Sequence, residues 1–223
     1  MHVLFPFQLL KQAARFQIVG QSVGAQQSIS GATTAVASMS ARWQATASFV
    51  LRDEDQHLAF RAFLAGMEGI LGTTNVPVLS RHRPLDRDGN AVAMTNVARL
   101  QDAQTFQHFG FANAQIVAAV LAEPAALRAT LIKVDYLDST GLRPGHRFSI
   151  NGRLYEVQLT WVDDAGDNVV QFQPPLRAAA ALGAVVDIHH PSCLMRFADA
   201  VLPPYDELSP RMQTVSLSFV EAT

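Results

Sequence analysis

The sequence predicts a mainly β protein of the α+β class: a β-sandwich or roll with one long helix and a small inserted β-barrel-like module. Two observations favour this class. One stretch near residue 45 alternates apolar and polar residues with a period of two, and several hairpin signals follow in the second half of the chain. A third observation, a segment with apolar residues at helical spacing, supplies the helix. With 223 residues the chain is long enough for one domain or two small ones.

The first fifty residues favour strands. Residues 15–19 alternate polar and apolar side chains and end at Gly20. Residues 22–40 are rich in Gly, Ser, Ala and Thr, which fits either an extended hairpin or a flexible loop. The clearest strand follows, with these apolar side chains on one face: Trp43, Ala45, Ala47, Phe49 and Leu51. This period of two predicts a strand that is buried on one side.

Residues 53–71 predict the helix. Asp53 can cap its free amides, and Gln56 stands at the capping-box position. The apolar positions share one helical face: Phe60, Phe63, Leu64, Met67 and Leu71. Gly69 and Gly72 mark its end. We expect this stripe to pack against the sheet.

Residues 73–128 carry weaker patterns. Residues 81–90 form a polar loop with a turn at Asp88-Gly89. Short apolar pieces follow, including Phe106, Phe109, Phe111 and residues 116–121, and some of them are expected to be strands. Residues 124–127 are expected to form a short helical turn.

From residue 129 the pattern predicts a compact β module. Residues 131–136 read as a strand, and Pro144-Gly145 marks a type II turn. Asn151-Gly152 is a strong hairpin signal, and residues 163–168 form a second hairpin turn before the strand 169–172. The remaining predictions are a helical turn before Gly183, strands at 184–189 and 193–197, and a last strand at 214–219.

These patterns predict two domains. The first comprises residues 1–128 with the returning segment 197–223, and carries the helix. The second is the β module at 129–196, inserted into the first. Two sequential domains that divide near residue 128 are the alternative.

The composition bears on partners and location. Only 16% of the residues are charged, a hint that neighbouring subunits cover part of the surface. The formal net charge of −2 gives no reason to expect specific nucleic-acid binding. A single cysteine, Cys193, excludes an intramolecular disulfide and fits a reducing cytoplasm. The N-terminus does not read as a signal peptide, and the apolar runs are too short to cross a bilayer, so no membrane partner is expected.

Three segments could carry chemistry. His189 and His190 precede Cys193, but adjacent histidines on an extended strand are expected to point to opposite faces, so a strand end with a buried cysteine is the favoured interpretation. Residues 163–167 contain three aspartates that lack the ligand order of a calcium loop and read as hairpin-turn acids. The basic residues 81–83 read as a solvated loop or a partner contact. The sequence therefore predicts no catalytic, cofactor-binding or metal-binding residues, no cofactor, and a protein that is not an enzyme.

Two regions carry a resemblance to a known family. The first is the strand Arg42-Trp43-Gln44-Ala45-Thr46-Ala47, followed by a helix that ends in Met67-Glu68-Gly69. The second comprises the segments 142–150, 153–157, 172–177 and 191–196, and residues 216–221 then read as a closing strand. In this order they resemble the distal tail proteins of long-tailed, siphovirus-like bacteriophages and of related phage-derived particles. The family helix ends in a Leu-Arg-Gly-like sequence, from which Met67-Glu68-Gly69 departs. The matches cover roughly two-thirds of the chain and omit residues 73–128.

The resemblance implies a structural virion protein of the tail tip. Such proteins form a homo-oligomeric ring, usually a hexamer, that joins the tail tube protein to the hub or baseplate proteins. The expected location is the virion tail, with the host cytoplasm during assembly. Another tail component, such as a tube or terminator subunit, is an alternative.

Two further alternatives come from other classes. A carbohydrate-binding module for the host surface would need exposed aromatic residues, and Trp161 is the residue to test, because Trp43 lies on the apolar face of its strand. A hydrolase that uses Cys193 is the weakest alternative.

Overall fold

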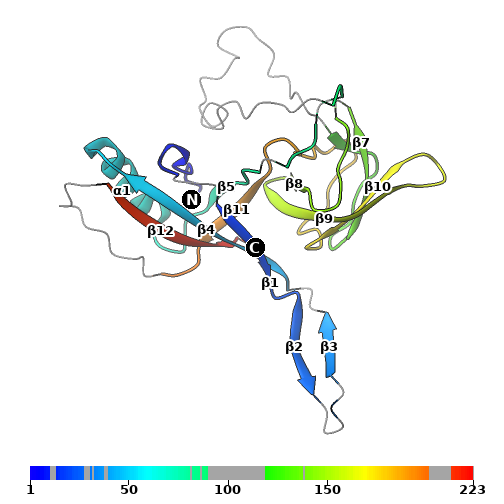
Figure 1. The fold of residues 1–223 in the computed structure, drawn as a ribbon, viewed down its shortest axis with the longest axis horizontal. Coiled ribbons are helices and arrows are strands. Elements are labelled where there is room, and N and C mark those ends of the chain that lie inside the picture. Colours follow the sequence, from blue (N-terminus) through cyan, green and yellow to red (C-terminus); the bar gives the residue numbers. More distant parts are fainter. Residues whose placement is uncertain are drawn as a thin grey trace.

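The computed structural model describes residues 1–10, 14–27, 31, 33–37, 40–80, 82–85, 87–89, 119–137, 139–200 and 212–222. These residues form a mainly β structure with two antiparallel five-stranded sheets, a separate two-stranded hairpin and one α-helix (Figure 1). The predicted fold class is confirmed.

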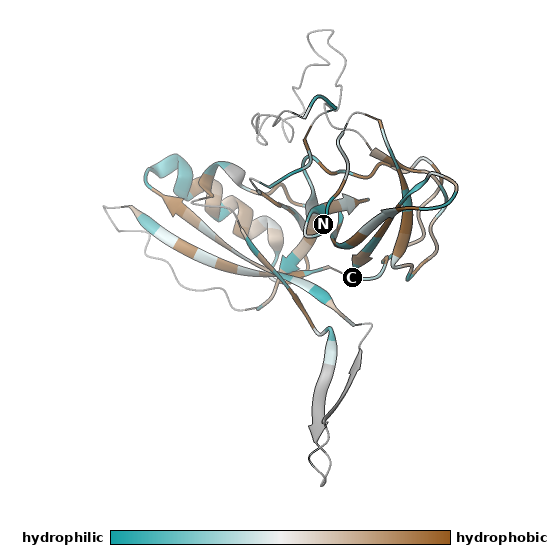
Figure 2. Ribbon diagram, turned by 45° about the vertical axis from the view of Figure 1, so that its right-hand side comes forward, coloured by the Kyte–Doolittle hydropathy of each residue, from teal (hydrophilic) through white to brown (hydrophobic). Residues whose placement is uncertain are grey.

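The first sheet gathers strands from both ends of the chain. Its order is β1 (Arg15–Val19), β4 (Arg42–Leu51), β12 (Gln213–Glu221), β11 (Ser192–Phe197) and β5 (Thr74–Pro77). The predicted alternation in β4 is confirmed, because every second side chain from Trp43 to Leu51 is buried. Figure 2 shows alternating hydrophobic and hydrophilic bands along the long strands of this sheet.

Helix α1 (Glu54–Met67) covers the apolar face of the first sheet. The predicted cap is confirmed: the Gln56 N–H donates to Asp53 Oδ1 at 3.0 Å, and Gln56 Oε1 accepts from the Arg52 N–H at 2.9 Å. The helix ends before the predicted residue 71, because Glu68 adopts a left-handed conformation. Leu71 is consequently exposed rather than part of the buried stripe.

The core between the helix and the first sheet is aromatic. Phe49 of β4 lies with its ring centroid 5.5 Å from that of Phe60 and 6.3 Å from that of Phe63. Phe5 contacts the same ring from the N-terminal segment, beside the 3-10 turn η1 (Phe7–Leu9). The helix and the N-terminus are thereby fixed to one face of the sheet.

The second sheet curls into a half-barrel. Its order is β6 (Ala119–Leu121), β7 (Leu131–Tyr136), β10 (Asn168–Gln173), β9 (Arg153–Val162) and β8 (Arg147–Ile150). The two predicted turns are confirmed. Gly145 has φ +85° and the His146 N–H donates to the Arg143 carbonyl at 2.9 Å, whereas Asn151 and Gly152 both have positive φ in the β8–β9 hairpin.

The strands of the two sheets do not follow the predicted domain boundaries at residues 129 and 197. β6 lies before residue 129 yet belongs to the second sheet, and β11 begins before residue 197 yet belongs to the first. The predicted strand at 184–189 is wrong, because Val185 and Asp187 form only isolated bridges. The predicted helical turn at 124–127 is also wrong, since Ala125 bridges Ala180 instead. Phe106, Phe109, Phe111 and residues 116–118 lie outside the described residues.

The segment 22–40 fitted either a hairpin or a loop, and its described residues form a hairpin. β2 (Ser22–Gln27) pairs with β3 (Thr33–Ala37), and neither strand joins a larger sheet among the described residues. The hairpin continues the β1–β4 pair and stands away from the body of the molecule (Figure 1).

Candidate functional site

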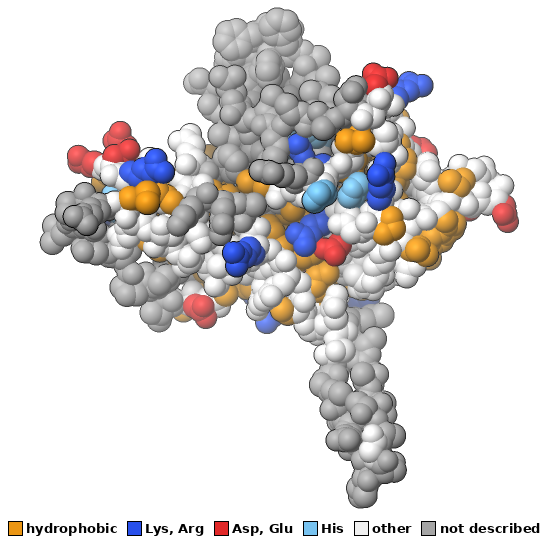
Figure 3. All heavy atoms as spheres, in the orientation of Figure 1, with side chains coloured by type: hydrophobic (Ala, Val, Ile, Leu, Met, Phe, Trp, Pro, Cys, Tyr) orange, Lys and Arg blue, Asp and Glu red, His pale blue; other side chains and the backbone are white. Residues whose placement is uncertain are grey.

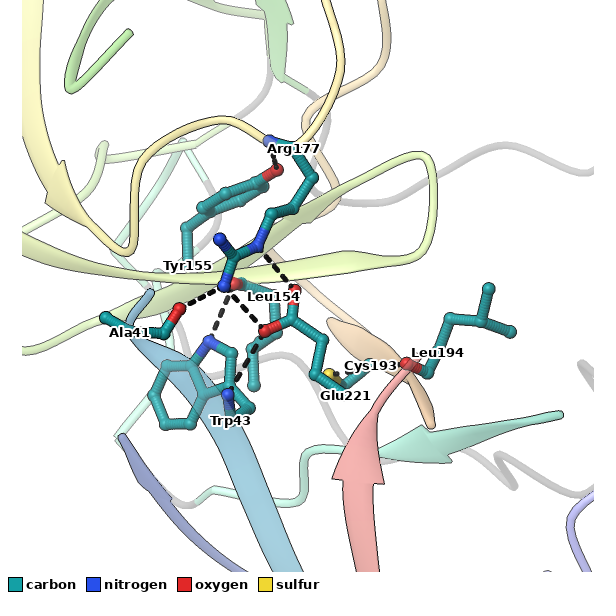
Figure 4. A network of polar contacts seen from close by, with 8 residues as sticks. All are labelled: Ala41, Trp43, Leu154, Tyr155, Arg177, Cys193, Leu194 and Glu221. Carbon is teal, nitrogen blue, oxygen red and sulfur yellow. Dashed lines mark hydrogen bonds and ion pairs between the residues drawn. The ribbon is translucent and has the colours of Figure 1, made fainter. Parts of the chain in front are cut away.

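A buried ion pair joins the two sheets. Glu221, at the end of β12, is 1% exposed, and its carboxylate accepts hydrogen bonds from Arg177 Nε and Nη2, both at 3.0 Å (Figure 4). Arg177 lies in the loop that follows β10, and its Nη2 also donates to the Ala41 carbonyl. The Trp43 N–H donates to Glu221 Oε2 at 3.1 Å. One carboxylate therefore links the first sheet to a loop of the second through two-point contact with a guanidinium.

Strand β9 contributes to both cores beside this ion pair. Leu154 packs in the core of the first sheet, and its carbonyl accepts from Trp43 Nε1 at 2.7 Å. Tyr155, the next residue, packs in the core of the second sheet, and its hydroxyl accepts from the Arg177 N–H at 3.3 Å. Because successive side chains of a strand point to opposite sides, β9 ties the two cores together.

Arg177 and Tyr155 hold their protons firmly at this junction. Burial lowers the pKa of the Arg177 guanidinium, but the contacts with Glu221 raise it by more, so the net shift is upward. Burial also raises the pKa of the Tyr155 hydroxyl. A guanidinium and a phenol that keep their protons this firmly have no general acid or base role near neutral pH. We refer to the Arg177–Glu221 ion pair, with its contacts to Trp43 and Ala41, as the clamp, because it joins the two sheets.

A second arginine supports the same junction. Arg147 Nε donates to Glu156 Oε2 at 2.8 Å, and its guanidinium carbon lies 5.1 Å from the Trp43 ring centroid. The Phe16 ring centroid is 6.0 Å from the same carbon. Arg147 of the second sheet therefore rests on aromatic rings of the first.

Sequence reasoning missed this clamp. Arg177 and Glu221 lie 44 residues apart, and neither stands in a recognisable motif. The available signal was Glu221 itself, a carboxylate at the end of a strand with buried apolar residues. Buried carboxylates need a cationic partner, but the sequence does not say which of its arginines supplies it.

The histidine pair lies in a bend rather than on a strand. The centroids of the His189 and His190 rings are 4.0 Å apart, so the expectation that they point to opposite faces is wrong. Asp187 Oδ1 accepts from both backbone N–H groups, at 3.2 Å and 2.8 Å. Arg83 Nη1 donates to the His189 carbonyl at 3.3 Å. The bend therefore brings together side chains that an extended strand would separate.

The His189 cluster predicts acid-sensitive stability. Burial, with the neighbouring His190 and Arg83, lowers the pKa of His189 from 6.5 to about 4, and Asp187 opposes this shift. The unfolded chain therefore binds a proton near pH 6.5 that the folded protein binds only near pH 4. We expect the stability to be complete above pH 6.5 and to fall by roughly 1–2 kcal/mol as the pH drops toward 4, after discounting for solvent screening.

Thermal unfolding across this pH range checks the expectation. The pKa of His190 is also lowered by burial, so it acts in the same direction, whereas burial raises the pKa of Asp187, which opposes both. His189→Gln removes the main titrating group and should flatten the dependence. An unchanged slope in His189→Gln would assign the effect to other groups.

Cys193 lies in the core of the first sheet on β11. Burial raises the pKa of its thiol strongly, and Glu221 adds to this shift. A thiol that stays protonated is a poor nucleophile. The prediction of a buried cysteine is confirmed.

Asp163 and Asp167 lie in the β9–β10 turn, as predicted. Asp163 Oδ1 accepts from the N–H groups of Ala165 and Asp167 at 3.0 Å and 2.9 Å. Lys133, which sequence reasoning did not single out, lies between three carboxylates with N–O distances of 2.8–3.0 Å: Glu123, Asp163 and Asp167. Hydrogen bonds to Asp167, Asp163 and Glu123 raise the pKa of Lys133, so its charge is fixed.

The basic segment and the second tryptophan differ in exposure. Arg81 lies outside the described residues, and His82 is exposed. Arg83 is half-buried against His189, so the solvated-loop interpretation is wrong for it. Trp161 is 40% exposed on the second sheet.

Within the described part of the chain, no group of three or more His, Cys, Asp or Glu side chains is placed to hold a metal ion. None of the described helices has the length and apolar character to cross a membrane. No protein-family model matches the chain, and no curated protein matches it.

Proposed function

We propose that this protein is a structural subunit of a phage tail tip, which assembles into a closed ring of about six copies between the tail tube and the hub or baseplate. The resemblance of residues 42–69 and 142–196 to distal tail proteins supports the class of particle. The buried clamp supports a mechanical role, because the Arg177–Glu221 pair joins two sheets and the Arg177 guanidinium keeps its proton.

The hairpin β2–β3 carries the proposal. A two-stranded ribbon is at best marginally stable in water unless another surface covers it. This one projects from the body, and its strands pair only with each other among the described residues (Figure 1). A neighbouring subunit is the surface that such an element fits. A hairpin that reaches from each copy to the next is a heterologous contact, the kind that closes a ring.

The first sheet offers a surface for such a contact. β1 is one of its edge strands and has only exposed or half-buried residues, so its outer edge can pair with another chain. The face opposite the core is polar, with Gln17 bonded to Gln44 and Ser48 bonded to Ser216. A hollow of about 400 Å³ on this sheet is lined by residues of β1, β4 and β12 with Ala198 and Asp199.

Deletion of residues 22–39 tests the proposal. Val19 and Arg42 pair directly in the β1–β4 ladder, so Gly20, Gln21, Ser40 and Ala41 remain as a four-residue loop that can close it. We expect the deletion variant to fold and to lose the ring. Light scattering and negative-stain imaging of both proteins measure the copy number, and circular dichroism checks the fold.

Asp55→Ala, an exposed change in the first turn of α1, is the matched control and should leave the ring intact. A folded deletion variant with an unchanged ring would remove the hairpin from the contact. A wild-type protein that stays a single copy at high concentration, and with tail tube protein added, would refute the ring.

A tube subunit is the second candidate, and the same hairpin favours it, because tube subunits pair long hairpins around their lumen. The position of the protein in the assembled tail distinguishes a tail-tip subunit from a tube subunit. Antibody labelling at one end of assembled tails supports the tail-tip role, whereas labelling along the whole tail supports a tube subunit.

A further inference from the structure

One half of strand β9 has an open edge. β10 pairs with β9 from residue 156 to residue 162, whereas β8 pairs only with residues 153–156. The turn before β8 adds one more residue, because Val157 bonds to Gly145 and His146. Beyond that point, Gln158 lies at a β-bulge and β10 is the only strand partner of residues 159–162 within the described ranges. Backbone groups that face away from β10 are free to pair with another strand.

The register identifies those groups. The Phe172 N–H donates to the Thr130 carbonyl on the β7 side, so the alternation of an antiparallel ladder turns Gln171 and Val169 toward β9. Their opposite residues are Leu159 and Trp161. Thr160, between these two, therefore has its N–H and carbonyl toward the open edge.

The open segment lacks the protection that exposed edges usually carry. Its sequence, Gln158-Leu159-Thr160-Trp161-Val162, has no charge, proline or glycine, and it is rich in residues that favour strands. Leu159 is 53% exposed and Val162 63%. Figure 3 shows hydrophobic side chains gathered on this lobe, with an acidic side chain at its tip.

Opposite charges stand at the two ends of the segment. The tip beyond Val162 is acidic: Glu123, Asp163, Asp164 and Asp167 supply four carboxylates against the single Lys133, a net charge of −3. At the other end lies the exposed Arg143, in the turn whose Gly145 bonds to Val157.

We propose that this edge pairs with the same edge of a second copy of the chain, antiparallel about a two-fold axis through Thr160. An edge that is acidic at one end and basic at the other complements itself in this orientation, since each tip meets the Arg143 turn of the second copy. Leu159 of each copy then lies opposite Trp161 of the other on one face. The pairing does not depend on the proposed ring, and in a protein that forms the ring it joins two rings.

Sedimentation velocity on the full chain tests the pairing. Leu159→Lys introduces a charge into the edge and should weaken association ~10-fold or more. Leu131→Lys is the matched control. It changes a leucine of the same face with similar exposure, 50%, on β7, which lies between β6 and β10. The proposal is supported if the sedimenting species of Leu159→Lys has half the mass of the wild-type species, while Leu131→Lys keeps the wild-type mass. Equal effects of both changes, or a wild type without two-fold association, would overturn it.

A charge exchange tests the orientation. Arg143→Glu and Asp164→Arg should each weaken the pair, and the double variant should restore it, because each changed residue meets its new counterpart across the axis. Failure of the double variant to recover would contradict the antiparallel arrangement.

Thr160→Cys tests the axis. Directly opposed residues in a bonded antiparallel pair have Cα atoms about 5.5 Å apart, within reach of a disulfide. The variant should form a cross-linked dimer on mild oxidation, whereas the wild type, whose Cys193 is buried, should not. A variant that stays uncross-linked while associating would exclude this register. A glycan that binds wild type, but not Trp161→Ala, and leaves the mass unchanged would assign the surface to carbohydrate instead.

Discussion

Glu221→Ala is expected to lower the free energy of unfolding by ~3–5 kcal/mol, because it leaves the Arg177 guanidinium buried without its counter-charge. The side chain of Arg177 is largely enclosed, at 17% exposure, and that of Glu221 is fully enclosed. The Trp43 N–H also loses its acceptor, and an unpaired buried donor carries its own cost. Urea denaturation of wild type and variant at neutral pH measures the difference.

A double variant separates the charge from the space that it fills. Arg177→Met with Glu221→Leu removes both charges and keeps much of the volume, so most of the stability should return. Recovery should stay incomplete, because leucine does not accept from the Trp43 N–H. Glu156→Gln is the control for an ion pair nearer the surface, with a cost below ~1 kcal/mol. A Glu221→Ala variant that loses no more than this control would show that water reaches the clamp.

The local elements of this fold could be predicted from sequence because their causes are local. A capped helix start at Asp53 and a Gly at +85° in the type II turn depend on residues within a few positions. The period of two in β4 reports a face buried against one core. Each of these signals stands in a short window of sequence.

Pairings between distant segments could not be predicted in the same way. The sheet that receives β11 depends partly on β5, which lies more than a hundred residues earlier in the chain. β6 has only three residues, too few to show a period. The bend at His189-His190 breaks an alternation that apolar spacing alone suggested. The partner of Glu221 could have been any arginine. These features depend on which surfaces pack together in the folded chain, and the sequence of a single segment does not determine this.

Trp43→Ala is expected to cost ~3–5 kcal/mol, the range for truncation of a large buried aromatic side chain. Trp43 is 0% exposed and contacts Phe16 edge-on, with ring centroids 6.1 Å apart. Its Nε1 donates to the Leu154 carbonyl of β9, and Arg147 lies over its ring. The substitution therefore opens a cavity and also removes contacts between the two sheets.

Trp43→Phe divides this loss into its parts. Phenylalanine keeps an aromatic ring for Phe16 and Arg147 but cannot donate to the Leu154 carbonyl, which leaves a buried acceptor unpaired at a cost of about 1–3 kcal/mol. Because β9 serves both cores, we expect wild type to unfold in one transition and Trp43→Ala to broaden or split it. Calorimetry and near-ultraviolet circular dichroism follow the two sheets together. Two transitions already present in the wild type would mean that the clamp positions the sheets without making their folding cooperative.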